Sequence, residues 1–371
     1  MIPASGIIRR FMKPCLMIGL LIFVAACSSQ AKRLNFEVAA KDARVWPNQP
    51  EQPRYRYVGT LIGEQNFDHS SEGGFSRFFR WLVGLGSGDK PPQLELLRPS
   101  SGTVDAEGRV LVTDVARHSV MVFDVEKGDI FEWQLAAADN GFKTPIGVVS
   151  GPDGSYFVSD ADLQMVVKLA HDGSPMATFG NDILKRPTGM ARDPDSGRLY
   201  VADTKAHNIK VFDDNGFLED IIGSRGTAIG QFNAPTHLYF SKGKLYVTDT
   251  FNTRIQIIDI KNDVNKGFGQ RGRYLGDLVR PKGVAADSDE NIYVVESYHD
   301  YLLVYDKSGR YLMPIGGTGK EIGQFYLPSG VWVDKNDKIY VADMFNGRVV
   351  VFQYLGGKGA SQTNQTMLNK H

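Results

Sequence analysis

The sequence predicts an all-β fold in which six similar blades close into a ring, a six-bladed β-propeller. Three regularities support this prediction. A proline precedes a short apolar run six times, an acidic residue ends the next apolar run six times, and an aliphatic residue always follows six positions after that acid. The prolines are Pro99, Pro145, Pro187, Pro235, Pro281 and Pro328, at intervals of 46, 42, 48, 46 and 47 residues. The acidic residues, called the blade acids below, are Asp114, Asp160, Asp203, Asp249, Glu296 and Asp343.

Each repeat predicts four short strands. After the proline comes an apolar run such as GVAAD at 283–287, then a turn such as SDEN at 288–291, then a second strand such as LYVTD at 245–249. A polar link leads to a third strand such as RIQIID at 254–259, and a variable segment with a glycine-rich turn ends the repeat. Alternating runs of this length, bounded by Gly, Asn, Asp and Pro, are typical of strands. They exclude a solenoid of helix pairs.

The sequence pattern of the repeat resembles that of the NHL repeat family. The best copies are PTGMARDPDSGRLYVADTKAHNIKVFDDNG at 187–216 and PSGVWVDKNDKIYVADMFNGRVVVF at 328–352. The resemblance covers about residues 97–356, and it implies a six-bladed propeller. Some relatives in this family are metal-dependent enzymes, and some animal members bind RNA.

The ends of the repeat array predict how the ring closes. The last repeat stops after its third strand, VVVFQYL at 349–355, and lacks a fourth. A fourth-strand pattern stands instead before the first repeat, RYRYVGTLIG at 54–63. We expect this segment to complete the final blade, which removes the open seam of the ring. The propeller would then span 54–356, followed by a disordered tail at 357–371.

The first residues predict export and a lipid anchor. Arg9, Arg10 and Lys13 precede the uncharged apolar run at 15–26, which is too short to cross a bilayer as a helix but suits a signal peptide. The run ends in VAAC, which resembles the lipobox of bacterial lipoproteins, so residues 1–26 would be removed and Cys27 lipidated. Ser28 implies the outer membrane in this resemblance. Residues 27–53, with the Pro-rich stretch VWPNQPEQPR, would form an extended tether.

Charge and cysteine content narrow the function. Residues 1–26 hold three of the 42 basic residues and none of the 42 acidic ones, so the remainder carries 39 basic and 42 acidic residues. That balance is unlike the basic excess of nucleic-acid-binding proteins. One of the two cysteines lies in the signal peptide and the other is Cys27. A disulfide, a thiol nucleophile or a Cys-ligated metal in the propeller is therefore excluded.

The blade acids are interpreted as structural because six copies around a ring do not make six active sites. A carboxylate at the end of the second strand can accept backbone N–H bonds from the tight link that follows. Arg254 and Arg348 are expected to pair with such an acid. Glu296, with its longer side chain, is expected to fit the turn less well or to reach outwards.

Departures from the repeat indicate where function lies. The position two residues after the proline is Gly in four repeats but Ser101 and His237 in the other two, and Lys282 follows Pro281. We expect these three residues to line the central channel. One channel histidine is too few for a zinc site, which normally needs at least three protein ligands, so no metal or other cofactor is predicted.

Residues 64–96 form an insertion between the closing strand and the first repeat. Within it Phe75, Phe78, Phe79 and Leu82 follow the spacing of an amphipathic helix, with Trp81 beside them. This short helix either packs on the propeller or docks a partner or the membrane interface.

The sequence therefore predicts a non-enzymatic, lipid-anchored scaffold or sensor. It would bind a protein or cell-envelope component through one propeller face, at the bacterial outer membrane, and it would not bind nucleic acid. The alternative is a metal-dependent enzyme, similar to lactonases or lyases, with its site in the central channel. No GxSxG or HExxH motif supports that alternative.

Overall fold

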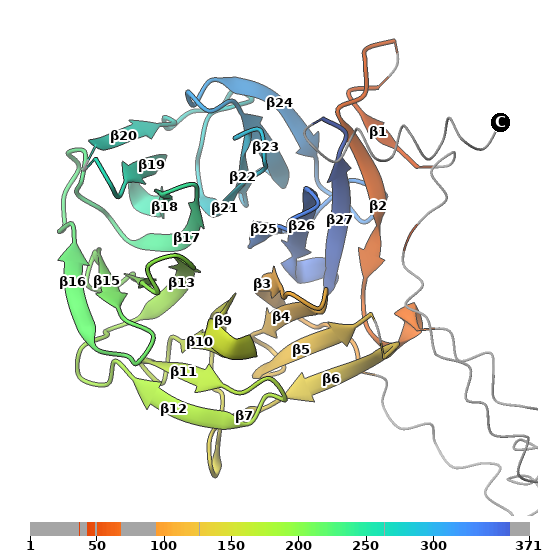
Figure 1. Cartoon of the computed structure of the whole chain (residues 1–371). Coiled ribbons are helices and arrows are strands. Elements are labelled where there is room, and N and C mark those ends of the chain that lie inside the picture. The colour runs from red at the N-terminus through yellow and green to blue at the C-terminus, as the bar shows by residue number, and fades with distance from the viewer. Residues whose placement is uncertain are drawn as a thin grey trace, which may run out of the picture.

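The computed structural model describes residues 37, 43–48, 50–67, 94–125, 127–262 and 264–356, and every structural statement below refers to these residues. They form six antiparallel blades around a common centre, with β3, β9, β13, β17, β21 and β25 innermost (Figure 1). The predicted all-β, six-bladed propeller is confirmed. Within each of the first five blades, consecutive strands are neighbours from the centre outwards.

The strands of the first three blades agree with the predicted order. Blade one contains β3 (Pro99–Val104), β4 (Val110–Asp114), β5 (Ser119–Asp124) and β6 (Asp129–Trp133). A hairpin of β7 (Leu135–Ala137) and β8 (Asn140–Gly141) follows. Blade two contains β9 (Pro145–Ser150), β10 (Tyr156–Asp160), β11 (Met165–Leu169) and β12 (Pro175–Phe179), with the short 3-10 turn η2 (Pro152–Gly154). Blade three contains β13 (Pro187–Arg192), β14 (Leu199–Asp203), β15 (Asn208–Phe212) and β16 (Leu218–Ile222).

The last three blades complete the ring. Blade four contains β17 (Pro235–Ser241), β18 (Lys244–Asp249), η3 (Thr250–Asn252), β19 (Arg254–Asp259) and β20 (Val264–Phe268). Blade five contains β21 (Pro281–Ala286), β22 (Ile292–Glu296), β23 (Tyr301–Tyr305) and β24 (Tyr311–Gly316). Blade six contains β25 (Val331–Val333), β26 (Lys338–Asp343), η4 (Met344–Asn346) and β27 (Arg348–Tyr354), joined by β2 (Tyr55–Leu61) and β1 (Val45–Trp46).

The N-terminal strand closes the ring as predicted. β2 pairs antiparallel with β27, from Tyr55 opposite Tyr354 to Leu61 opposite Val349 (Figure 1). β1 adds a fifth strand, with Val45 opposite Arg56. The boundary of the predicted tether, 27–53, is therefore wrong at its C-terminal end, because Val45 and Trp46 belong to blade six. Trp46 is buried and packs edge-on against Phe352 at 5.4 Å, which explains why this short, Pro-flanked segment joins the sheet.

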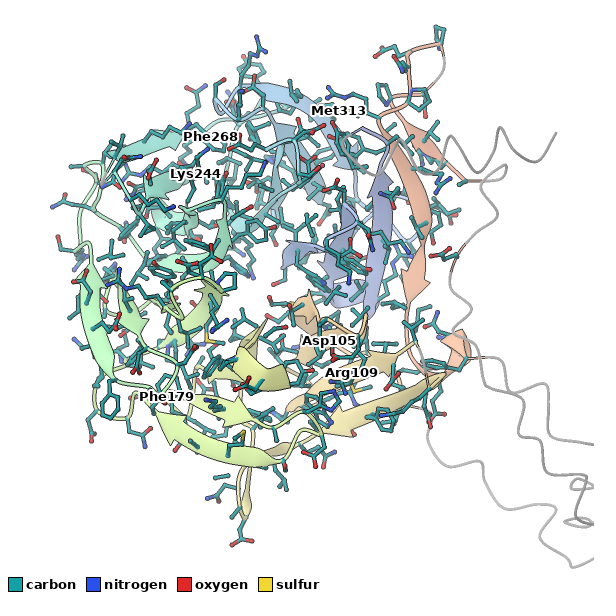
Figure 2. The ribbon with its side chains drawn as sticks, viewed as in Figure 1. Asp105, Arg109, Phe179, Lys244, Phe268 and Met313 are labelled. Carbon is teal, nitrogen blue, oxygen red and sulfur yellow. The ribbon has the colours of Figure 1, made fainter. Side chains whose placement is uncertain are left out.

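The second strands are buried almost throughout, because both of their faces meet a neighbouring blade. Every residue of β4, β10, β14 and β22 is buried, whereas β16 on the outside is largely exposed. Polar side chains also join blades. Arg109 donates to Asp105 at 2.7 Å (Figure 2). The Tyr156 hydroxyl of blade two donates to the same carboxylate at 2.9 Å.

No α-helix occurs among the described residues, and none of their helical turns is long and apolar enough to cross a membrane. The predicted docking helix, Phe75 to Leu82, lies outside the described residues. The described residues end at Phe67, after η1 (Glu64–Asn66), and resume at Leu94. Gly63 and Glu95 form an isolated β-bridge, so the two ends of the insertion lie side by side.

Removal of the closing strands β1 and β2 tests whether the propeller needs them for a stable fold. A chain of residues 64–371 lacks β1 and β2 and exposes their partners on β27, whereas a chain of 43–371 retains both. The buried side chains Tyr55, Val58 and Leu61 stabilise the fold by roughly 1.5–3 kcal/mol each, a sum comparable to a typical total stability of 5–15 kcal/mol. We expect 43–371 to unfold cooperatively and 64–371 to be aggregated or unfolded by circular dichroism. Equal melting temperatures would contradict this closure.

Candidate binding face and central channel

The blade acids hold the chain where it enters each innermost strand. Asp114 is fully buried and accepts the backbone N–H groups of Leu97 at 2.6 Å and Arg98 at 3.0 Å, just ahead of the repeat proline. It also accepts the N–H groups of Ala116 and Arg117 in the following link, each at 3.0 Å. Asp160 bonds in the same pattern. One carboxylate therefore ties the entry of a blade to its second strand.

Blades four and six use a variant with side-chain donors. Asp249 accepts the Asn233 N–H at 2.6 Å, the Asn252 amide at 2.8 Å and the Arg254 guanidinium at 2.8 Å. The other nitrogens of Arg254 donate to carbonyls of the loop at 227–231. Asp343 repeats this arrangement with Asn346 and Arg348. The expected pairing of both arginines is confirmed, and these acids are occupied by structural contacts.

Of the two alternatives expected for Glu296, the outward orientation is wrong. Glu296 is 1% exposed and accepts the N–H groups of Val279 at 2.8 Å, Arg280 at 2.9 Å and Tyr298 at 3.1 Å. It therefore accepts the same two N–H groups ahead of the repeat proline as Asp114 does, but only one from the following link, where Asp114 accepts two.

One face of the ring carries the links between second and third strands together with the connections from one blade to the next. These segments share a face because the four strands of a blade alternate in direction. We call it the link face. Its links are residues 115–118, 161–164, 204–207, 250–253, 297–300 and 344–347, and the connections between blades lie at 134–144, 180–186, 223–234, 269–280 and 317–327.

Three consecutive blades present an aromatic side chain at the same repeat position on the link face. Two residues after the blade acid stand Phe251, Tyr298 and Phe345, which are 70%, 62% and 48% exposed. Tyr326 packs edge-on against Phe345 at 5.6 Å. These four residues are called the aromatic arc. Blades one to three carry Ala116, Asp162 and Lys205 at this position. Aligning the repeats on the blade acid would have revealed the arc from sequence.

Basic side chains predominate among the exposed charged residues of the link face. Arg98 lies over the Phe345 ring at 5.2 Å. The exposed acids on this face are few, and Asp162 among them is paired with Arg186 at 3.0 Å. The other exposed basic residues are Lys143, Lys185, Lys205, Arg225, Arg271, Arg273, Arg280 and Lys320. The face therefore combines exposed aromatic rings with positive charge.

The channel contains a cavity of about 380 Å³ between the innermost strands of every blade except blade five. Ser101 lines this cavity, together with apolar residues such as Val148 and Leu238. Its charged member, Arg192, is held by two bonds to Asp214 at 2.7 and 2.6 Å. His237 and Lys282 are not among its lining residues. They lie on the neighbouring strands β17 and β21, near the link face, because each closely follows a repeat proline.

His237 is 8% exposed, and its Nδ1 lies 3.1 Å from the Thr236 hydroxyl while its Nε2 has no partner. Burial, together with the charge of nearby Lys282, lowers the pKa of His237 to about 3. Burial, together with the charge of Arg280, also lowers the pKa of Lys282. His237 is therefore neutral at physiological pH. Among the described residues, no group of three or more His, Cys, Asp or Glu side chains is placed to hold a metal ion.

We call the set of bonds that a blade acid accepts the clamp, and it can be tested in blade four. Asp249→Ala leaves the Arg254 guanidinium and the Asn233 N–H without their buried partner, and we expect a loss of about 3–5 kcal/mol in the free energy of unfolding. Urea denaturation measures it. Asp220→Ala, on the exposed face of β16, is the control and should change stability by less than about 0.5 kcal/mol. Similar losses in both variants would argue against the clamp.

The low pKa of His237 predicts a pH dependence of stability. The unfolded chain takes up a proton on this residue below about pH 6.5, whereas the folded chain does not until about pH 3. Stability is therefore lost as the pH falls through this window. Between pH 7 and pH 4.5 the wild type should lose roughly 2–3 kcal/mol more than His237→Gln, as measured by urea denaturation at each pH. Parallel losses would show that His237 is accessible to protons.

Comparisons with known proteins agree with this architecture. A family model described as a 6-bladed β-propeller matches residues 282–370, and an NHL repeat model matches residues 184–212. The chain is similar to the protein brain tumor of Drosophila melanogaster, with 26% identity over 126 residues. That match covers 33% of this chain and only 12% of the relative's length.

Solved structures share the fold at low identity. A catalytically inactive virginiamycin B lyase from Staphylococcus aureus with quinupristin has a TM-score of 0.52 and 14% identity, covering 84% of this chain and 98% of that one. An auxiliary nutrient binding protein from Bacteroides thetaiotaomicron has a TM-score of 0.55 and 14% identity, covering 70% of each chain. At this identity the likeness concerns the fold alone. The chain is therefore a six-bladed β-propeller, and one of its repeats matches the NHL repeat model.

Proposed function

We propose that the chain is a non-enzymatic binding protein, anchored in the cell envelope through Cys27, that holds a protein or envelope component on its link face. The observation that carries this proposal is the aromatic arc. Phe251, Tyr298 and Phe345 expose large apolar surfaces at equivalent positions of three adjacent blades. Exposed aromatic clusters of this kind mark interaction surfaces, and aromatic side chains with Arg dominate the energy of interfaces.

The place where the insertion at residues 64–96 joins the propeller supports the link face as the binding surface. A Cβ atom at Gly347, in the link of blade six, would lie 2.8 Å from the carbonyl oxygen of Leu96. The chain thus re-enters the propeller beside the link that carries Phe345. The predicted docking residues Phe75, Phe78, Phe79, Trp81 and Leu82 precede this point in the sequence and lie outside the described residues.

The metal-dependent enzyme has less support from the described residues. The blade acids are occupied by backbone and arginine donors, and the described residues contain no group of three or more His, Cys, Asp or Glu side chains placed to hold a metal ion. The structural neighbours include both a lyase and a binding protein, so the fold does not favour catalysis.

The proposal is tested by substituting the arc. The triple variant Phe251→Ser, Tyr298→Ser, Phe345→Ser removes three interface anchors without touching the core. Loss of one such anchor typically costs more than 1 kcal/mol, so we expect the crosslinked partner recovered from native membranes to fall by more than about tenfold. Quantitative mass spectrometry compares the recovered partners.

The control carries the same kind of substitution elsewhere. Met176→Ser, Phe217→Ser and Val264→Ser remove exposed apolar side chains from or beside the outer strands, away from the link face. This variant should recover the partner at the wild-type level. Equal recovery in both variants, or equal loss in both, would count against the link face as the binding surface.

A further inference from the structure

The connections that lead into blades four, five and six are glycine-rich loops of one conformation, at residues 223–231, 269–277 and 316–324. In each loop the first and the eighth residue are glycines with positive φ. An isolated parallel bridge closes each loop, and the bridged pairs are Arg225 with Phe232, Arg271 with Leu278, and Thr318 with Phe325. The three loops can therefore be compared residue by residue.

In blade four an arginine of the chain itself fills the site beside this loop. Arg254 donates to the carbonyl oxygens of Thr227 at 2.7 Å and Gln231 at 2.9 Å, and it pairs with Asp249 at 2.8 Å. Blade six repeats these three bonds with the equivalent residues, which are Arg348, Lys320, Gln324 and Asp343. One guanidinium thus bonds to two loop carbonyls and one buried carboxylate in both blades.

Blade five has the same loop but lacks the arginine. Tyr301 stands five residues after the blade acid, where blades four and six carry arginine, and His299 stands where they carry asparagine. Neither side chain forms a hydrogen bond with a described residue. The carbonyl oxygens of Arg273 and Asp277 are the equivalents of those that accept the arginine in blade four. They accept no hydrogen bond from the described part of the chain.

A pocket of about 220 Å³ lies where the other two blades hold the guanidinium. It is lined by the loop at 273–277 and by the side chains of Glu296, His299 and Tyr301. We call it the blade-five pocket. It opens to solvent at the tip of the loop, where Tyr274 is 85% exposed. A side chain from outside the propeller can therefore enter it.

The acids of the blade-five pocket have no counter-charge. Glu296 and Asp277 are both buried, and neither forms an ion pair with a described basic residue. The equivalent of Asp277 in the other two loops is an uncharged glutamine, Gln231 and Gln324. Blade five thus gains an acid at the position where it loses the arginine. Arg273 at the rim does not prevent cation binding, because its equivalent in blade six is Lys320, beside a site that an arginine occupies.

We propose that the blade-five pocket binds the side chain of an arginine that belongs to a protein partner. The guanidinium donates to the carbonyls of Arg273 and Asp277 and pairs with Glu296, as its equivalent does in blade four. Lysine suits the pocket less well, because a compact ammonium lacks the planar fork that bonds to several acceptors at once. Tyr298 of the aromatic arc packs edge-on against His299 at 5.0 Å, so the arginine enters beside the arc. This inference rests on the proposed function and adds the chemistry of the partner.

Capped amino acids test the blade-five pocket without the partner. N-acetylarginine amide and N-acetylcitrulline amide have nearly the same shape and differ in charge. Both are titrated into residues 27–371 at constant ionic strength, and the NMR signals of the His299 ring report binding. We expect saturable binding of the arginine derivative, at least about tenfold tighter than that of the citrulline derivative. Equal affinities, or no saturable shift, would overturn the proposal.

Variants that copy the other two blades give the sharpest test. Tyr301→Arg supplies the missing guanidinium from within, so it should abolish binding of the arginine derivative and raise the melting temperature. Asp277→Gln should weaken binding at least threefold. Phe217→Arg adds the same charge at an exposed position of blade three and is the matched control, which should bind as wild type does. Unchanged binding by Tyr301→Arg, or a lower melting temperature, would contradict a guanidinium site.

The results separate this inference from the proposed function. If the arc variant loses the crosslinked partner but the wild type does not bind the arginine derivative, the pocket inference fails alone. If arginine binds but the arc variant keeps its partner, the aromatic arc fails alone. Tighter binding of free arginine than of the capped derivative would assign the pocket to a free amino acid and would overturn the protein partner.

Discussion

The buried carboxylate at the end of each second strand is the interaction on which the rest of the ring depends. A single Asp or Glu accepts backbone N–H groups from the segment that enters the innermost strand and, in most blades, from the link that follows. These N–H groups would otherwise be buried without partners, which is costly. Because the same clamp recurs in all six blades, each entry segment, and with it each innermost strand, is held at a similar place.

Hydroxyl side chains connect the clamped blades to one another. Thr113 donates to the carbonyl of Ile146, Thr204 to that of Pro235, and Thr248 to that of Lys282, so each bond passes from one blade to the innermost strand of the next. The ring is closed by β2, which pairs with β27 although nearly 300 residues separate them in sequence. The carboxylate bonds, the hydroxyl bonds between blades and the closing strand β2 together hold the six blades in one ring. Surface residues outside these contacts can differ from blade to blade.

The surface departs from the sixfold symmetry on the link face. The aromatic arc occupies blades four to six, which form one half of the ring. The other half carries small or charged residues at the arc positions. The exposed rings of Phe251, Tyr298 and Phe345 lie outside the buried core of their blades. Their presence in one half of the link face is what the proposed binding function explains.

The sequence by itself determined the blades, their number and the closing strand, because proline, blade acid and alternating strands are local signals that recur at a fixed period. It also determined the pairing of Arg254 and Arg348, which lie five residues after their acids. Only the tertiary structure decided three matters. β1 joins blade six through long-range contacts of Trp46, Glu296 is buried against the N–H groups of the loop before Pro281, and His237 is not among the residues that line the channel cavity. Each of these features depends on contacts between residues that are distant in the chain, so no local sequence pattern predicts it.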